Sequence, residues 1–168
     1  MNESAKTIEV LHSKYAGIVY HHCKQILGDR VEAEDAVQET FISAYRALKS
    51  RRYEGDHLPW LYRIATNASL KFLRTKRRKG VSLTEHPERF GAPELEPGNK
   101  LFARHILQRL MDEIDDTSSH ILVAHYISGM SQGQIADSLE ISRRAVVKRL
   151  TTLRTRVSRI VEEEERDG

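Results

Sequence analysis

The sequence is poor in the residues that cross-link or interrupt a chain. Among its 168 residues there are one cysteine, four prolines and nine glycines. The single Cys23 excludes an internal disulfide framework and suits a reducing compartment, so we expect a cytoplasmic protein. No apolar run reaches the roughly 18 residues that predict a membrane span, and the N-terminus lacks a signal-peptide pattern. The scarcity of proline and glycine favours long helices and predicts an all-α fold.

Charge divides the chain into three parts. Residues 1–79 hold fifteen Lys and Arg against nine Asp and Glu, residues 80–100 hold two against four, and residues 101–168 hold ten against eleven. Three of the four prolines lie in residues 80–100, which break every helical period. We therefore predict two small helical domains, 1–79 and 101–168, joined by a flexible, acidic, proline-containing linker. Two basic blocks indicate two contacts with one polyanion. The acidic run Glu162–Glu165 is expected to be a solvated helix end.

The stretch from Tyr53 to Lys79 combines aromatic rings with positive charge. A short polar loop precedes Pro59, whose fixed φ suits the first turn of a helix. From Trp60 onward apolar residues recur at intervals of three and four, and six cations follow between positions 71 and 79. Rings can stack on unpaired bases and cations can hold a phosphate backbone, which predicts a nucleic-acid site. The alternative is a solvated helix end whose cations complement the helix dipole.

The helix predicted over residues 29–50 has two contrasting faces. Asp29 is placed to cap it, and Glu32 completes a capping-box pattern. One face is an apolar seam directed inward. The other is acidic and polar with one aliphatic side chain, and comprises Asp35, Gln38, Glu39 and Ile42. It is either a solvated face or a docking surface for a basic partner helix, and periodicity does not decide between them.

Residues 131–150 show the pattern of a helix-turn-helix. Ser131 and Gln134 form a capping box that opens a short helix, and Ser142 can cap the helix after the turn. Glu140 stands where such turns often place glycine, at an expected cost of about 1 kcal/mol. The second helix keeps its basic side chains outside, which suits entry into the major groove by its N-terminus. The alternative is an ordinary helical hairpin with a basic face.

Three segments, in this order, resemble the extracytoplasmic-function (ECF, group IV) sigma factors of RNA polymerase. They are EAEDAVQETFISAYRAL, WLYRIATNASLKFLRTKRRK and, after the linker, GMSQGQIADSLEISRRAVVKRL, and the resemblance covers roughly residues 10–160. It implies two helical domains, region 2 and region 4, in a specificity subunit without catalytic activity of its own. The implied partners are core RNA polymerase (β′ clamp helices and β subunit), promoter DNA and an anti-sigma factor, often membrane-bound. We expect a monomer.

The resemblance also implies roles for individual positions. The acidic face of the second helix docks on the β′ clamp helices. The residues that capture and hold the melted non-template strand of the −10 element are Tyr53, Glu54, Gly55, Asp56, His57, Trp60, Tyr62, Asn67, Lys71, Arg74, Lys76, Arg77 and Arg78. The residues that read the −35 element are Ser142, Arg143, Arg144, Val147, Lys148 and Arg149.

Other classes of protein account for less of the sequence. An autonomous helix-turn-helix regulator has no use for an acidic docking helix or an aromatic loop before a basic helix. A nuclease needs a carboxylate pair, a nucleophile–base pair or a metal cluster, and none has suitable spacing. The run His21-His22-Cys23 does not predict a metal site, because adjacent helical side chains point about 100° apart. We expect no metal and no cofactor, with Cys23 as a small core residue.

Overall fold

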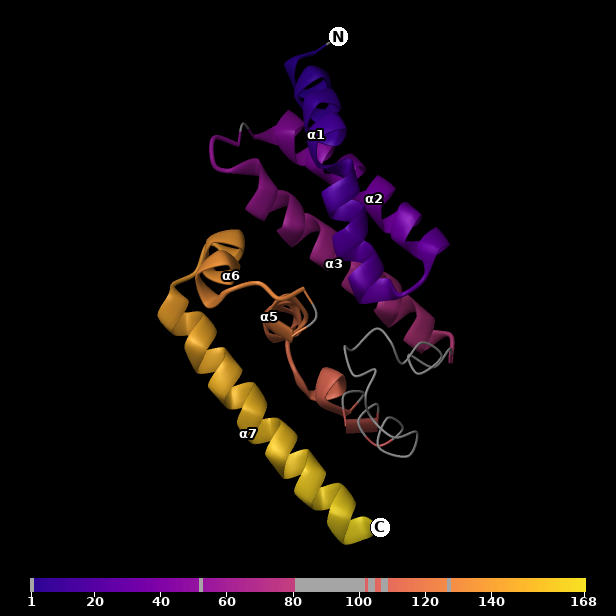
Figure 1. Cartoon of the computed structure of the whole chain (residues 1–168), viewed down its shortest axis with the longest axis vertical. Coiled ribbons are helices and arrows are strands. Elements are labelled where there is room, and N and C mark those ends of the chain that lie inside the picture. The colour runs from indigo at the N-terminus through magenta and orange to yellow at the C-terminus, as the bar shows by residue number, and fades with distance from the viewer. Residues whose placement is uncertain (1, 52, 81–101, 103–104, 107–108, 127) are drawn as a thin grey trace.

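The computed structural model of the protein describes residues 2–51, 53–80, 102, 105–106, 109–126 and 128–168. All regular secondary structure in these ranges is helical, which confirms the predicted all-α fold (Figure 1). The predicted linker lies, apart from Gly80, outside the described residues, so its boundaries stay a prediction. The helices are α1 (Glu3–Leu27), α2 (Arg30–Ser50), α3 (His57–Arg78), α5 (Asp116–Tyr126), α6 (Gln132–Leu139) and α7 (Arg143–Asp167). The described residues between 102 and 113 are also helical.

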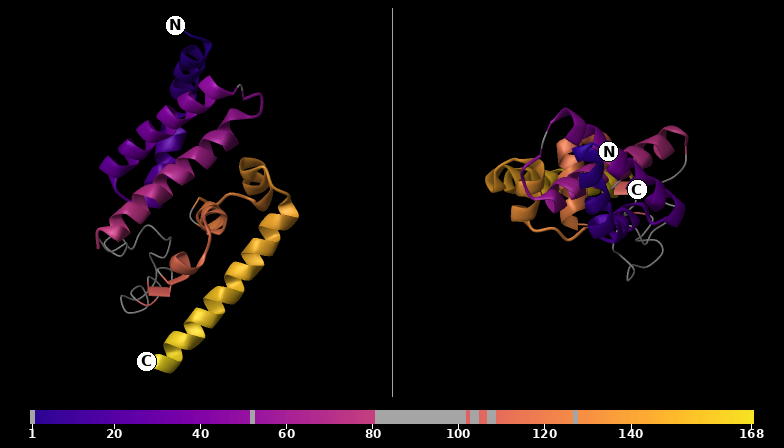
Figure 2. Two further views of the ribbon diagram at one scale, coloured as in Figure 1. Left: turned by 180° about the vertical axis from the view of Figure 1, so that it is seen from behind. Right: turned by 90° about the horizontal axis from the view of Figure 1, so that it is seen from above.

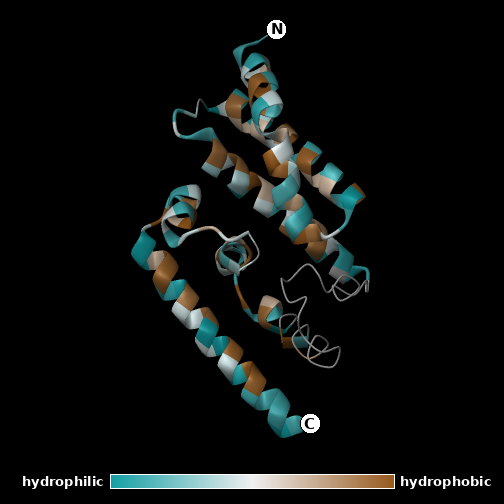
Figure 3. Ribbon diagram, in the orientation of Figure 1, coloured by the Kyte–Doolittle hydropathy of each residue, from teal (hydrophilic) through white to brown (hydrophobic). Residues whose placement is uncertain are grey.

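Helices α1, α2 and α3 pack together as the first bundle (Figures 1 and 3). Local chemistry sets where α1 ends and α2 begins. Gly28 closes α1 at φ 72°, a left-handed conformation that glycine adopts without a Cβ clash. Asp29 Oδ1 then accepts a hydrogen bond from the Glu32 N–H at 2.9 Å and caps α2 as predicted. Each large buried apolar side chain contributes about 1.5–3 kcal/mol to stability. The core includes Val19, Ile26, Leu27, Phe41, Leu61, Ala65 and Leu70.

The second bundle consists of α5, α6, α7 and the helical residues between 102 and 113. Ser131 Oγ accepts from the Gln134 N–H at 3.1 Å and Gln134 Oε1 accepts from the Ser131 N–H at 2.8 Å, which is the predicted capping box. Glu140 turns the chain at φ 56°, and Ser142 caps α7. The predicted helix-turn-helix is therefore present. Its core includes Ile121, Ile135, Val146, Leu150 and Ile160.

The acidic end of α7 is only partly the solvated run that the sequence predicts, because Glu162 and Glu165 are exposed whereas Glu163 and Glu164 are paired with cations. Glu163 and Glu164 accept hydrogen bonds from Arg109 at 2.7 and 2.5 Å, and Glu164 also lies 3.2 Å from His105. Arg159 pairs with both Glu163 and Glu113. The expectation was wrong for Glu163 and Glu164, because this end of α7 packs along the helical residues between 102 and 113, where the side chains of Arg109 and His105 face these two carboxylates.

The two bundles are in contact. Helix α3 of the first bundle faces α5 and α6 of the second, as two views show (Figures 1 and 2). Val123 of α5 belongs to the core of the first bundle, and Met111 touches both cores. Within the described ranges, no helix is both long and apolar enough to cross a bilayer.

Candidate nucleic-acid and partner interfaces

The aromatic loop before α3 is folded onto itself. The Tyr53 ring stacks on Trp60 with a centroid distance of 4.8 Å and an interplanar angle of 12°, and His57 meets both rings edge-on. Tyr53 Oη donates to the Asp56 carbonyl at 3.2 Å. Gly55 permits this arrangement, because a Cβ there would lie 2.5 Å from Tyr53 Oη. The loop thus brings together two of the predicted aromatic positions, with Tyr53 on one face of Trp60.

The basic end of α3 is divided between exposed and paired cations. Lys71 and Arg78 are exposed. Arg74 pairs with Asp116 of α5 at 2.8 Å, and Lys76 pairs with Glu32 of α2. The side chain of Arg77 lies outside what the structure describes. Of the cations predicted to contact the DNA backbone, two are therefore exposed to solvent and two are already paired with carboxylates.

Tyr62 and Asn67 lie on α3 about 140° apart, because they are five residues apart on a helix. Tyr62 is half-buried, meets His22 edge-on at 4.7 Å, and has its pKa raised by burial. Asn67 Oδ1 lies 3.2 Å from His120 Nδ1 of α5, which donates in the tautomer that is protonated at this nitrogen. The structure thus does not bring these two side chains together, although each is close to the second bundle.

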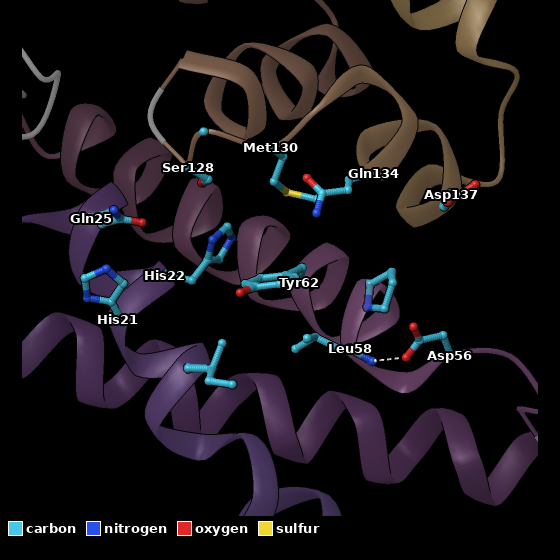
Figure 4. A pocket seen from close by; sticks show the side chains of 13 residues that line it. His21, His22, Gln25, Asp56, Leu58, Tyr62, Ser128, Met130, Gln134 and Asp137 are labelled. Atoms are coloured by element: carbon cyan, nitrogen blue, oxygen red, sulfur yellow. Dashed lines mark hydrogen bonds between the residues drawn. The ribbon is translucent and has the colours of Figure 1, made fainter.

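A cavity of about 520 Å³ separates part of α1 and α3 from the second bundle (Figure 4). Tyr62 and His22 face Met130 and Gln134 across it. Its lining residues are Ile18, His21, His22, Gln25, Asp56, Leu58, Pro59, Tyr62, Ser128, Gly129, Met130, Gln134 and Asp137. The packing between the bundles is therefore incomplete at this end of α3.

His22 is a structural residue that the sequence interpretation missed. Its side chain is buried, and Nε2 lies 2.7 Å from Thr66 Oγ1, which ties α1 to α3. Burial, and then the nearby charges of His120 and His21, lower its pKa to about 3. The helical period offered a signal, since His22 lies three residues after Val19 on the buried stripe. Cys23 is fully buried, as predicted.

The predicted docking face of α2 is exposed and borders an apolar groove. Asp35 and Gln38 are exposed, Ile42 is 40% exposed, and Glu39 accepts from Ser43. The groove, of about 490 Å³, is lined by Ile8, His12, Glu34, Val37, Gln38, Phe41, Ile42 and Tyr45. The sequence interpretation missed the contribution of α1 to this groove. It also missed Val31, which is 64% exposed and shares the helical stripe of Asp35, Gln38 and Ile42.

The start of α7 presents most of the predicted −35 residues. Ser142 Oγ accepts from the Ala145 N–H at 3.1 Å and caps the helix. Arg143, Arg144, Val147 and Lys148 are exposed beside it. Arg149 differs, because its guanidinium is bound at the start of α5: Nη1 donates to Asp115, which precedes the helix, and to Ser118 Oγ in its first turn, both at 2.9 Å.

Within the described part of the chain, no three His, Cys, Asp or Glu side chains gather in a way that could hold a metal ion.

Comparison with known proteins places both bundles in one family. Residues 11–79 match the family model of sigma-70 region 2, and residues 104–160 match that of sigma-70 region 4. The ECF RNA polymerase sigma factor SigM of Bacillus subtilis is 27% identical over 139 residues, which cover 81% of this chain and 83% of SigM. The chain belongs to the ECF sigma factors. This sigma factor directs promoter-specific initiation of transcription by RNA polymerase, as the resemblance predicted.

Two solved structures share the fold of this sigma factor. CnrH, solved in complex with the cytosolic domain of CnrY, is 20% identical with a TM-score of 0.51, covering 95% of this chain and 90% of CnrH. The sigma factor RpoE of Bartonella quintana, solved with the anti-sigma factor NepR, is 15% identical with a TM-score of 0.50, covering 94% of this chain and 98% of RpoE. At these identities the likeness shows the fold alone.

Proposed function

We propose that this sigma factor works through three separate surfaces. Helix α2 and its groove bind core RNA polymerase, the Tyr53 loop with α3 binds the melted −10 strand, and the start of α7 reads the −35 element. The observation that carries the proposal is the Tyr53–Trp60 stack at the start of a helix whose other end is basic. Stacking rings and a row of cations are the two components that single-strand binding requires.

Strand capture uses the aromatic loop as a platform for bases. Tyr53 covers one face of Trp60 in the free chain, and a flipped base takes the place of, or adds to, this ring contact. Melting DNA costs several kcal/mol, and stacking of about 1–3 kcal/mol per base offsets part of that cost. Tyr62 and Asn67 line the path of the strand, and the exposed Lys71 and Arg78 hold its phosphates.

Polymerase docking combines charge with a small apolar contact. The carboxylates on the exposed stripe of α2 orient a basic partner helix, while Ile42 and the groove beside it bury apolar surface. Such a division is common at protein interfaces, because charge steers the encounter and buried apolar surface slows dissociation. The partner is the pair of clamp helices in the β′ subunit.

The N-terminal half of α7 recognises the duplex DNA of the −35 element. The positive dipole at its N-terminus favours phosphate, and Arg143, Arg144 and Lys148 add charge beside it. Arginine is the side chain best suited to guanine, since its fork matches two acceptors on one base edge. Val147, 39% exposed, is placed for an apolar contact with a thymine methyl group.

The chain adds specificity to the polymerase and catalyses no reaction itself. It acts as a cytoplasmic monomer without metal or cofactor. An anti-sigma factor, membrane-bound or soluble, holds it inactive by covering the surfaces that polymerase needs. The likeness in fold to RpoE, which was solved with an anti-sigma factor, supports this last part of the proposal.

Run-off transcription with purified core RNA polymerase tests the proposal. A library of promoter fragments is transcribed with and without the protein. The expected result is a set of transcripts that require the protein and whose templates share −35 and −10 sequences. Binding to duplex DNA by the protein alone, without transcripts or association with core polymerase, would instead show an autonomous regulator.

A further inference from the structure

We propose that the cavity beside Tyr62 is a binding site for a small organic amine in its ammonium form. This goes beyond the proposed function, because the site belongs to the chain alone, without polymerase or DNA. The volume of about 520 Å³ lies within the range of roughly 300–1,000 Å³ that is usual for small-molecule sites. The walls come from α1, the start of α3, the turn between α5 and α6, and α6 itself (Figure 4).

The charge of the walls selects a cation. Asp56 and Asp137 line the cavity, whereas no Lys or Arg does among the described residues, although the chain contains 27 of them. Neither of these carboxylates forms an ion pair with a described residue. Figure 4 places both toward one side of the cavity, with Tyr62 between them and His21. A phosphate or carboxylate ligand would be repelled here, so the ligand that fits carries positive charge.

Asp56 is oriented by the backbone and retains acceptor capacity. One of its oxygens, Oδ1, accepts a hydrogen bond from the Leu58 N–H at 3.1 Å, which fixes the carboxylate at the start of α3. A carboxylate has about four acceptor positions, so this bond leaves others for a ligand. Asp137 lies on α6 and is exposed. An ammonium group between the two bundles can therefore donate to carboxylates from both.

Two aromatic rings and three apolar side chains suit the organic part of such a ligand. Tyr62 meets His22 edge-on, with ring centroids 4.7 Å apart. Burial lowers the pKa of His22 to about 3, so this ring adds no positive charge at neutral pH. A cation is attracted to the face of an aromatic ring within about 6 Å of its centroid. Ile18, Leu58 and Met130 can cover hydrocarbon, which favours an organic ammonium over a small inorganic cation.

A buried hydroxyl in the wall is a further observation, independent of charge. Ser128 lines the cavity, and its Oγ is buried without a hydrogen-bond partner among the described residues. Buried polar atoms nearly always have a partner, because leaving one unpaired is unfavourable. Ser128 belongs to the wall opposite His22 and Tyr62 (Figure 4). An N–H of an ammonium group in the cavity can donate to this oxygen.

Isothermal titration calorimetry on the full-length protein tests the class of ligand. The probes are pentane-1,5-diamine and 2-phenylethylamine, and the control is glutarate, which has the same number of carbon atoms as the diamine and the opposite charge. At least one amine should bind saturably at one site per chain, and glutarate should not bind. Binding by neither amine would overturn the proposal, as would glutarate binding as tightly as the amines.

Two matched variants test the location. Asp137→Asn removes one carboxylate of the cavity and keeps its shape, whereas Asp167→Asn removes an exposed carboxylate at the far end of α7. Both proteins lose one negative charge, so any effect of net charge is the same in both. Asp137→Asn should weaken amine binding about two- to fivefold relative to Asp167→Asn, as expected for one exposed charge pair. Equal affinities would overturn the assignment to this cavity.

A third variant tests the buried hydroxyl. Ser128→Ala should also weaken amine binding, without a fall in melting temperature, because the hydroxyl that it removes has no partner in the described chain. Amine binding as tight as in the unchanged protein would overturn this part of the site. Thermal melting checks that every variant is folded. Since these titrations contain neither polymerase nor DNA, their failure is distinguishable from a failure of the proposed function, which appears as a lack of transcripts.

Discussion

Nη1 of Arg149 lies within 3.0 Å of both carboxylate oxygens of Asp115, and the same atom donates to Ser118 Oγ. The Ser118 N–H and this guanidinium together lower the pKa of Asp115 to about 2. A side chain predicted to contact a base therefore also connects α7 to the start of α5.

Arg149→Ala should lower the free energy of unfolding by about 1 kcal/mol, because it removes a charged hydrogen bond at a half-exposed site. Asp115→Asn should cause a similar loss, and the double variant should lose less than the sum of the two. Urea unfolding measures all three. Lys148→Ala, one residue away and exposed, is the control and should leave stability unchanged while weakening −35 binding. Additive losses would mean that the Arg149–Asp115 contact does not stabilise the fold.

Tyr62→Ala and Asn67→Ala should impair promoter opening more than binding to core polymerase. The reason is that both side chains are placed to meet the melted strand, and loss of a stacked ring costs about 1–3 kcal/mol per base. Open-complex formation is followed by permanganate footprinting, and core binding by fluorescence anisotropy. Thr75→Ala, an exposed position on the same helix, is the control. Equal losses in opening and in core binding would contradict the assignment.

Gly55→Ala should separate Tyr53 from Trp60. The added Cβ would lie 2.5 Å from Tyr53 Oη, so the ring must move away from its stacked position. Trp60 is the single tryptophan of the chain, so its intrinsic fluorescence reports this change directly. Gly17→Ala is the control, since no atom lies within 4 Å of its Cβ position. Unchanged emission in Gly55→Ala would show that the loop accommodates the methyl group without losing the stack.

Ile42→Lys should weaken binding to core polymerase by about 1–2 kcal/mol, because it replaces the apolar contact at the centre of the docking face with a charge. Val10→Lys is a matched control: Val10 is 64% exposed on α1 and is not among the residues that line the groove. Surface plasmon resonance with immobilised core polymerase measures both variants. Equal affinities for the two variants would place the docking surface elsewhere.

Stability should fall as the pH is lowered below about 6.5, the ordinary pKa of histidine. The pKa values of His22 and His120 are lowered by burial to about 3 and about 4, so the unfolded chain binds protons in this range while the folded chain does not. Each histidine then costs about 1.4 kcal/mol of stability per pH unit, until the folded form is protonated as well.

Urea unfolding at several pH values between about 7.5 and about 4.5 tests this pH dependence, because the range brackets the ordinary pKa of histidine. His22→Gln retains a hydrogen-bonding side chain opposite Thr66. It should reduce the slope of the free energy of unfolding against pH by the contribution of one histidine. His21→Gln, exposed on the same helix, is the control and should leave the slope unchanged. An unaltered slope in His22→Gln would show that this ring is protonated in the folded chain.

Most of the architecture was predictable because it depends on neighbours along the chain. Asp29, Ser131 and Ser142 cap helices within three residues of themselves, and Gly28 ends α1 by its own backbone freedom. The apolar stripes of α2 and α3 likewise follow from the helical period. The candidate site was predicted less completely, since the exposed residues of α2 and α7 could be named but not their partners.

By itself the sequence determined the all-α fold, the helix ends, the helix-turn-helix and the sigma-factor family. Tertiary structure alone decided which polar side chains are paired: Arg149 with Asp115, Glu164 with Arg109, and Asn67 with His120. The physical reason is that helical periodicity determines which residues share a face of one helix, but it does not determine which faces of different helices pack together. Partners that lie 34 to 55 residues apart come together only when the helices pack.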